Sequence, residues 1–364
     1  MVAAALAAVG CARSGGGADP DGDAGGATPD ATAGIDAAWP PPPPDPVDGP
    51  ADHLLIDDTV HPGGVWGEPL DFRMADYPLG WAIATVHASM LLRNECIDLG
   101  PNAVLSVALK ESRLTCAQPG APSQLDGCFQ IEATSAYLEL GRMFSDRFAG
   151  SHAAVIGGDH FETSAIAMAH YYVFATAMFR KYAACPEAFF VAHPDRRTPQ
   201  KVLTGAYNRG LWWPSLQDIF TTCADRDVMT CFAHTIATDY TGAIVAYTAA
   251  LDAAPAFDAP VRWDDLAAYW TRLKPIYPDV ADETALATLR TAFDYQRAGA
   301  DTVSFKDAIR PILRDLIVTL PAMATVDQAA AAACGQSYLS GDACNVGAAC
   351  VDRDRCPRDD GTIP

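Results

Sequence analysis

Apolar residues recur with the spacing of an α-helix through most of the chain after residue 76. Large apolar side chains return every three or four positions, which places them on one face of a helix. Strand-like alternation of apolar and polar residues is scarce. The stretches with the helical period are 79–95, 103–114, 161–182, 200–207, 231–251, 263–273 and 283–297. The sequence therefore predicts a mainly α domain over residues 76–330, with helix ends near Gly100-Pro101 and Cys185-Pro186.

The chain begins with a short apolar run, MVAAALAAVGC, that ends in small residues at a cysteine. This run is too short to span a bilayer and is typical of a lipoprotein signal over residues 1–11. Ala8 stands where Leu is usual, and an ordinary secretory signal or a chance Ala-rich terminus is the alternative. We expect Cys11 to carry a lipid anchor to a membrane. The expected location is the cell envelope, as a periplasmic or outer-membrane lipoprotein, or outside the cell as a secreted protein.

Residues 12–75 are predicted to form a disordered tether. Up to residue 52 they are mostly Gly, Ala, Asp and Pro, with almost no large apolar side chain. The run WPPPPPDP favours extended polyproline II. Such a segment would hold a lipid-anchored domain away from the membrane surface.

The chain has 11 cysteines, and acylation of Cys11 would leave an even number for disulfides. Short loops favour the pairs Cys116–Cys128 and Cys223–Cys231, which leaves Cys96 with Cys185. Residues 331–364 form a small cysteine-rich tail with Cys334, Cys344, Cys350 and Cys356. A zinc site in this tail is the alternative, but the tail has no CxxC pair and no nearby histidine.

Composition limits the class of partner. Half of the residues are hydrophobic, which is enough for a sizeable core, and the formal net charge is −20. Without a cluster of lysines and arginines to neutralise phosphates, we expect no nucleic-acid partner. We also assign no cofactor and no metal, because no HExxH spacing occurs and the acidic and histidine residues that could bind one are loosely spaced. These residues are His152, Asp159, His160, Glu162 and His170.

Glu111 is out of place in the stretch ALKESRLTC. On an amphipathic surface helix Lys110 and Arg113 would face solvent, whereas Glu111 falls on the apolar face, where a carboxylate is costly. The apolar residues at i, i+3 and i+4 of that face are Val104, Val107 and Ala108. Loss of hydration there should raise the pKa of Glu111 and keep the carboxyl protonated near neutral pH.

Three short motifs share an order and spacing with a known family. Glu111-Ser112, the stretch GCFQI at 127–131 and the stretch AYNRG at 206–210 resemble the E-S, G-L-M-Q-I and A-Y-N-x-G motifs of soluble-lytic-transglycosylase-type lysozyme-like domains. Between them, SAIAMAHYY at 164–172 occupies the place of the family's helix N-x-x-A-G-A-x-Y-L. The resemblance covers about residues 100–215, with departures at Ser164, Met168 and Cys128.

This resemblance implies a lysozyme-like fold and cleavage of the β-1,4 bond between N-acetylmuramic acid and N-acetylglucosamine in peptidoglycan strands. Glu111 would protonate the leaving oxygen and then act as base toward the C6 hydroxyl, closing a 1,6-anhydro ring. By family analogy Tyr207 would hydrogen-bond Glu111. Ser112, Gln130 and Asn208 would meet the hydroxyl and N-acetyl groups of the sugar.

Several alternatives remain open from the sequence. Glu111 could pair with an arginine, and Gln130, Asn208 and Tyr207 could be turn, cap or core residues. Glu132 is either a solvated glutamate at a helix start or a second carboxylate that positions water, as in goose-type lysozymes. Hydrolysis by a muramidase or a chitinase-like enzyme is therefore a second candidate function. A catalytically silent glycan-binding envelope protein is a third.

Overall fold

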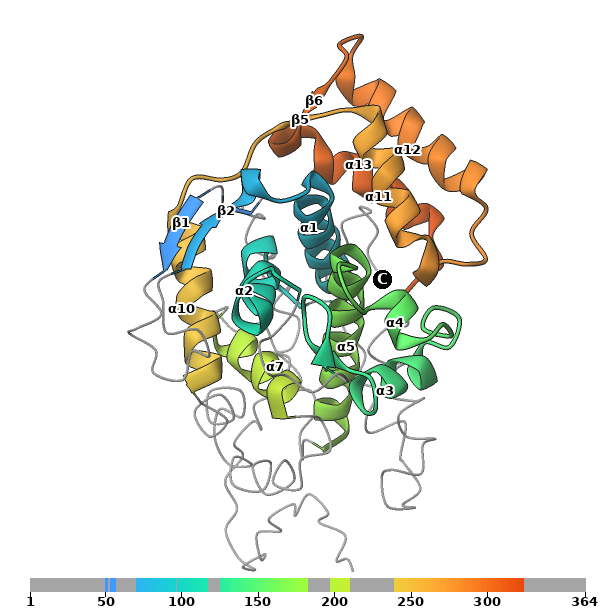
Figure 1. The fold of residues 1–364 in the computed structure, drawn as a ribbon. Helices are drawn as coiled ribbons and strands as arrows, with labels where there is room; N and C mark the ends of the chain where they lie inside the picture. Colours follow the sequence, from blue (N-terminus) through green and yellow to red (C-terminus); the bar gives the residue numbers. More distant parts are fainter. Residues whose placement is uncertain are drawn as a thin grey trace, which may run out of the picture. The chain divides into compact units, whose positions relative to one another are not determined.

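The computed structural model describes residues 50–51, 53–56, 70–95, 97–116, 125–182, 197–209 and 239–323. Helices make up most of these residues, which confirms the mainly α prediction (Figure 1). All of the described elements belong to one unit of the chain, Pro41–Pro364. Among the described helices, none is both long enough and apolar enough to cross a membrane.

The long helices follow the apolar periodicity of the sequence. They are α1 (Leu79–Asn94), α2 (Pro101–Ser112), α5 (Phe161–Tyr182), α7 (Arg197–Arg209), α10 (Asp239–Ala253), α11 (Trp263–Leu273) and α12 (Asp282–Arg297). Shorter helices are α3 (Ala136–Met143) and α4 (His152–Val155), together with the 3-10 turns η2 (Met74–Asp76) and η3 (Lys274–Ile276). The last described helix, α13 (Phe305–Thr319), has no counterpart among the periodic stretches and contains Pro311 in its interior. Most of its apolar residues, from Phe305 to Leu316, nevertheless lie buried against the core, so packing compensates for the interrupted helix ladder.

Helix α1 is the centre of the core. Every residue from Trp81 to Leu92 is buried, including polar ones, so this helix has no solvent face. It contacts α2, α5, α11 and α13. A helix buried on all sides needs neighbours on all sides, and α2, α5, α11 and α13 provide them.

Strands are short and paired in twos. Strand β1 (His53–Ile56) pairs antiparallel with β2 (Leu70–Arg73), with His53 opposite Arg73 and Ile56 opposite Leu70. The other pairs are β3 (Leu125–Asp126) with β4 (Ile131–Glu132), and β5 (Pro260–Val261) with β6 (Val303–Ser304). The β3–β4 pair is the strand element that shapes the candidate site.

The first strand pair corrects the predicted boundary of the tether. We expected the tether to continue to residue 75, but β1 and β2 lie within that range. Ala51 also bridges Ala256, and the Phe257 amide donates to the Pro50 carbonyl. These are main-chain contacts, which composition does not report, so the folded part of the chain begins by residue 50 instead of residue 76.

Several predictions concern residues outside the described ranges. They include the lipid anchor at Cys11, most of the tether, and the cysteine-rich tail over 331–364. The disulfides Cys223–Cys231 and Cys96–Cys185 also lie outside the described residues. The pair Cys116–Cys128 is described, and it forms the predicted disulfide.

Candidate active site

Glu111 lies where a buried helix reaches the protein surface. Every residue of α2 from Pro101 to Leu109 is buried, because the helix packs against both α1 and α10. This corrects the amphipathic surface helix expected from Lys110 and Arg113, since only the last turn of α2 approaches solvent. Glu111 is in that last turn and is partly exposed. The apolar body of the helix therefore ends at an acidic residue that is partly exposed.

The carboxyl of Glu111 is held close to the point of ionisation at neutral pH. Burial raises its pKa to about 7, while a hydrogen bond from Tyr240 and the charge of Lys110 act in the opposite direction. The direction of this shift agrees with the expectation from the apolar residues at i−7, i−4 and i−3. Desolvation is the larger effect because the neutral form avoids the cost of a charge next to apolar side chains.

The tyrosine that hydrogen-bonds Glu111 is Tyr240 and not the expected Tyr207. Tyr240, in the first turn of α10, donates to Glu111 Oε1. Tyr207 instead donates to the carbonyl oxygen of Phe129. Tyr240 was missed because it lies outside all of the quoted motifs. In the sequence Tyr240 lies within the periodic stretch 231–251 with nothing to mark it, and the packing of α10 on α2 brings it to the acid.

Tyr207 packs in a cluster of aromatic rings with Tyr171 and Tyr172. Its half-buried ring meets Tyr171 edge-on at 5.5 Å between centroids, and Tyr172 at 6.0 Å. Burial raises the pKa of Tyr207 well above its ordinary value, and the charge of Glu111 raises it further. Tyr207 therefore stays protonated and remains a hydrogen-bond donor.

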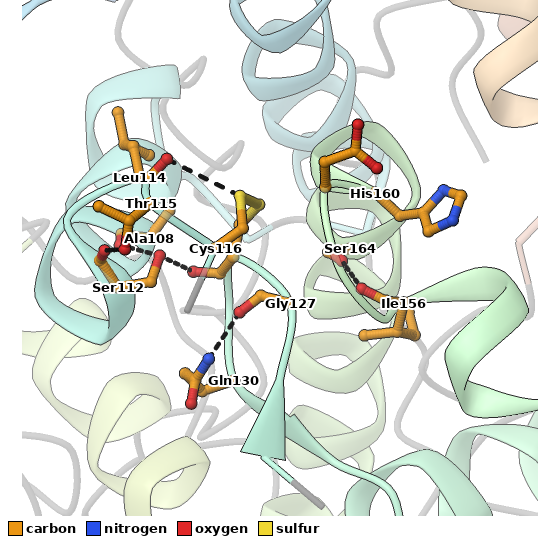
Figure 2. Close-up of a disulfide and its surroundings, with 12 residues drawn as sticks. Ala108, Ser112, Leu114, Thr115, Cys116, Gly127, Gln130, Ile156, His160 and Ser164 are labelled. Carbon is orange, nitrogen blue, oxygen red and sulfur yellow. Dashed lines mark hydrogen bonds between the residues drawn. A yellow bond between two sulfur atoms is a disulfide. The ribbon is translucent and has the colours of Figure 1, made fainter. Parts of the chain in front are cut away.

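Ser112 has a structural contact in place of the expected contact with sugar. Its side chain is fully buried, and its hydroxyl donates to the carbonyl of Cys128 at 2.8 Å and to that of Ala108 at 3.3 Å (Figure 2). The prediction that Ser112 meets a sugar hydroxyl does not fit this position. The residue next to the acid instead ties the end of α2 to the turn between β3 and β4.

The disulfide Cys116–Cys128 makes a second tie between the same two segments (Figure 2). The chain leaves α2 through Arg113, Leu114 and Cys116, all with positive φ. It returns in the turn at Gly127, whose φ of 83° favours glycine. The hydroxyl bond and the disulfide together set the position of the β3–β4 turn relative to Glu111.

Gln130 lies at the end of this turn, and among the described residues its side-chain amide nitrogen is hydrogen-bonded whereas its amide oxygen is not. Its side chain is 7% exposed, and its Nε2 donates to the Gly127 carbonyl at 2.7 Å. Its Oε1 is buried and has no hydrogen-bond partner among the residues that the structure describes. A buried acceptor without a partner is costly, so Gln130 is available to accept a hydrogen bond from a ligand. Asn208, one residue after Tyr207 on α7, is exposed.

The structure thus links the three sequence motifs through main-chain carbonyls of one turn. Ser112 bonds the carbonyl of Cys128, and Tyr207 bonds that of Phe129, so α2 and α7 hold the turn from two sides. Glu111 is then oriented by α10 through Tyr240. Gln130 follows directly on the same turn. The arrangement can offer one proton at Glu111 and polar groups at Gln130 and Asn208.

Glu132 has an environment opposite to that of Glu111. It lies in β4, and its carboxylate accepts hydrogen bonds from Thr134 at 2.8 Å and from Ser135 at 2.5 Å. These bonds lower its pKa, so Glu132 is ionised at neutral pH. The two glutamates therefore differ in their protonation state near neutrality.

Two of the histidines considered for metal binding, His152 and His170, are engaged by the protein, and His152 Nε2 lies 2.7 Å from the Ile131 carbonyl oxygen. His170 is fully buried, with Nε2 at 2.6 Å from Arg147 Nη1 and Nδ1 at 2.8 Å from the Ile166 carbonyl. Burial and the Arg147 charge hold its pKa well below the ordinary value, so it is neutral. Within the described ranges, no group of three or more His, Cys, Asp or Glu residues is arranged to hold a metal ion.

Comparison with known proteins shows a shared fold only. No protein-family model matches the chain, and no curated protein matches it. Among solved structures, the chain is similar to the crystal structure of an archaeal chitinase in the ligand-free form. The TM-score is 0.53 and the sequence identity 17%, over 80% of this chain and 67% of the chitinase chain.

Proposed function

We propose that this chain is a peptidoglycan lytic transglycosylase that uses Glu111 as its single acid and base. The observation that carries the proposal is Glu111, a partly exposed residue at the end of a buried helix, whose carboxyl has a pKa raised to about 7. A group with this pKa exists in both protonation states at neutral pH, so it can deliver a proton and later accept one. The motifs around Glu111, Gln130 and Tyr207, and the fold shared with a chitinase, support this assignment.

In the proposed reaction Glu111 gives its proton to the glycosidic oxygen between N-acetylmuramic acid and N-acetylglucosamine. The bond from C1 to that oxygen breaks, and positive charge develops on the ring. The Glu111 carboxylate then takes the proton of the C6 hydroxyl as its oxygen bonds to C1, which closes the 1,6-anhydro ring. No water is consumed. Tyr240 keeps the carboxyl oriented through both steps.

Polar groups near the acid are proposed to hold the sugar. Gln130 offers a buried Oε1 that no other described residue bonds, which suits the N–H of an N-acetyl group or a sugar hydroxyl. Asn208 offers an exposed amide that can both donate and accept. Ser112 is left out of this set, because its hydroxyl is engaged by Cys128.

Hydrolysis is the second candidate, either by a goose-type muramidase or by a chitinase-like enzyme. Two observations favour it: the ionised carboxylate of Glu132 and the fold shared with an archaeal chitinase. A hydrolase of this kind needs one protonated carboxyl and one ionised carboxylate that activates water. Glu111, with its raised pKa, could supply the protonated carboxyl, and Glu132, with its lowered pKa, the ionised carboxylate.

The test is mass spectrometry of muropeptides released from purified cell wall by the full chain. Sugar ends lighter by one water identify the anhydro product of a transglycosylase, and unmodified reducing ends identify hydrolysis. Chitin oligosaccharides in a parallel reaction test the chitinase-like alternative. If the chain binds cell wall but releases nothing, the assignment fails and the silent glycan-binding protein is favoured.

Two matched variants assign the acid in the same assay. Glu111→Gln keeps the shape of the side chain but has no proton to deliver, and general acid-base catalysis is typically worth about 10² to 10⁴ in rate. We expect this variant to lose at least that much activity. Glu132→Gln should retain most of the activity in a transglycosylase. A comparable loss in both variants would instead indicate the two-carboxylate hydrolase.

The proposal includes a location in the cell envelope through a lipid on Cys11. The apolar run before Cys11 and the Gly-, Ala-, Asp- and Pro-rich segment after it support this location. Cys11→Ala should release the protein from membranes into the soluble fraction. A variant that partitions into detergent like the unmodified protein, with residues 1–10 still present by mass, would exclude this anchor.

A further inference from the structure

The hydroxyl of Thr248 joins the three helices that carry the candidate site. Thr248 lies in α10, which packs against both α2 and α7 (Figure 1). Its oxygen accepts a hydrogen bond from Gln200 Nε2 of α7 at 2.7 Å, and its proton is donated to Ser106 Oγ of α2 at 2.8 Å. These are the helices that bear the acid, its tyrosine donor and Tyr207.

The bonds form a directed chain of buried groups. The Ser106 hydroxyl donates to the Asn102 carbonyl at 2.7 Å, so its oxygen is the acceptor toward Thr248. The Ile244 carbonyl, at 2.9 Å, is a second acceptor within reach of the Thr248 proton. The side chains of Gln200, Ser106 and Thr248 are each 2% exposed or less. A helix that moved would leave these polar groups buried without partners, which is costly.

Three side-chain hydrogen bonds join α2 to α10. From the start of α2 to its end, they are Asn102–Asp252 at 2.8 Å, Ser106–Thr248 at 2.8 Å and Glu111–Tyr240. Residue numbers rise along α2 while they fall along α10, so the two helices run antiparallel. The first two bonds therefore fix the register in which the third one forms.

Apolar packing does not by itself specify this register. Ile244 lies one turn after Tyr240 on the same face of α10 and is fully buried. If α10 slid by one turn, about 5.4 Å, Ile244 would take the place of Tyr240 and would offer Glu111 no hydrogen bond. Apolar side chains exchange such places at small cost, whereas buried hydroxyls lose their partners, so the polar bonds select the register.

We propose that Thr248 is a positioning residue for the acid, whose hydroxyl holds α10 on α2 in the register that brings Tyr240 to Glu111. Thr248 is buried, so it acts through Tyr240 and not on the substrate. This inference rests on the proposed function for the catalytic meaning of the Glu111–Tyr240 bond. Through Gln200 the same hydroxyl holds α7, whose Tyr207 bonds the turn beside the acid.

Matched variants separate this role from general packing. Thr248→Val removes the hydroxyl with little change in volume, and Thr248→Ser keeps it. Ser106→Ala breaks the same bond from α2 and serves if the valine variant does not fold. Thr204→Val is the control. Thr204 is 1% exposed on α7, and its hydroxyl donates to the carbonyls of Gln200 at 2.7 Å and Lys201 at 3.3 Å within its own helix.

The experiment measures the titration of Glu111 in the full chain, labelled with ¹³C at the side-chain carboxyl of glutamate. The Glu111 signal is assigned by its absence from Glu111→Gln. The bond from Tyr240 favours the ionised carboxylate, so we expect Thr248→Val to raise the midpoint by about 0.5–1 pH units. Thr248→Ser and Thr204→Val should keep the midpoint of the unmodified chain. An unchanged or lowered midpoint in the folded variant overturns the proposal, as does an equal rise in Thr204→Val.

A double variant tests whether Thr248 acts through Tyr240. Tyr240→Phe removes the donor outright, so the addition of Thr248→Val should raise the midpoint no further. Additive shifts would show that Thr248 reaches Glu111 by another route, and would overturn the proposal. In catalysis, the fall of kcat/KM at high pH should move upward with the midpoint. If the unmodified chain cleaves no glycan, the proposed function fails, while the titration still decides the role of Thr248.

Discussion

Tyr240 donates a hydrogen bond to the carboxyl of Glu111 across a separation of 129 residues in the chain. The bond joins the first turn of α10 to the last turn of α2, two helices that pack along each other. It favours the ionised form of Glu111, against the larger effect of burial. The orientation and the proton affinity of the acid therefore both depend on a helix far away in the sequence.

Tyr240→Phe should raise the pKa of Glu111 above its present value of about 7, because the carboxylate loses its donor. We expect the high-pH fall of activity to move upward, and turnover at its optimum to drop about ten-fold or more through loss of orientation. Tyr295→Phe is the control, because Tyr295 is 81% exposed on α12. A pH profile of Tyr240→Phe that matches the unmodified protein would contradict the role assigned to this bond.

Glu111→Gln should make the protein more stable at pH 8 and leave its stability nearly unchanged at pH 4. The folded state raises the pKa of Glu111 from 4.5 to about 7, so between these values it binds more protons than the unfolded state. Stability from this group is complete below pH 4.5 and declines as the pH rises to 7, by up to about 3 kcal/mol.

Urea unfolding of both proteins at several pH values measures this effect. Glu139, whose pKa is raised to about 8, contributes equally to both proteins and cancels from the difference. A difference in unfolding free energy that does not vary with pH would show that Glu111 has an ordinary pKa. A loss of stability in Glu111→Gln at all pH values would instead indicate a structural ion pair.

Removal of the disulfide should affect both stability and the site. Replacing Cys116 and Cys128 together by serine opens a loop with a sequence separation of 12. We expect the free energy of unfolding to fall by about 3 kcal/mol on the chain-entropy estimate. Because the loop connects α2 to the turn that carries Gln130, the Michaelis constant should also rise. Loss of stability with unchanged substrate affinity would limit the bond to a stabilising role.

Gly127→Ala should destabilise the protein more than Gly158→Ala. Both glycines have positive φ, 83° and 64°, so alanine is strained at each by about 1 kcal/mol. At Gly127 a Cβ would in addition collide with the carbonyl oxygen of Ile156, whereas nothing lies within 4 Å at Gly158. The Ile156 carbonyl also accepts a hydrogen bond from Ser164 at 3.1 Å, which limits its movement (Figure 2).

Thermal unfolding of the two alanine variants checks this difference. The Tm should fall by several degrees more for Gly127→Ala, because the added overpacking typically costs about 1–3 kcal/mol of unfolding free energy. Equal shifts would mean that the turn adjusts freely and that its position beside Glu111 is not fixed by Ile156.

The sequence by itself determined most of the long helices and the unusual character of the acid. Periodic apolar residues predicted α5 and α11 at their observed bounds, because a helix that buries one or more faces must repeat apolar residues at its own period. The same local argument placed Glu111 next to buried apolar residues and predicted the direction of its pKa shift. Loop length likewise predicted the disulfide Cys116–Cys128, since its closure is a local property of the chain.

Only the tertiary structure decided which groups surround Glu111. Periodicity did not distinguish Tyr240 from Tyr207 as its partner, did not show that Ser112 bonds the Cys128 carbonyl, and did not include β1 in the fold. Each of these contacts joins segments that are remote in the chain or involves a main-chain group. The pattern of a single element reports which of its faces is buried, but the identity of the neighbour follows from how the helices pack together.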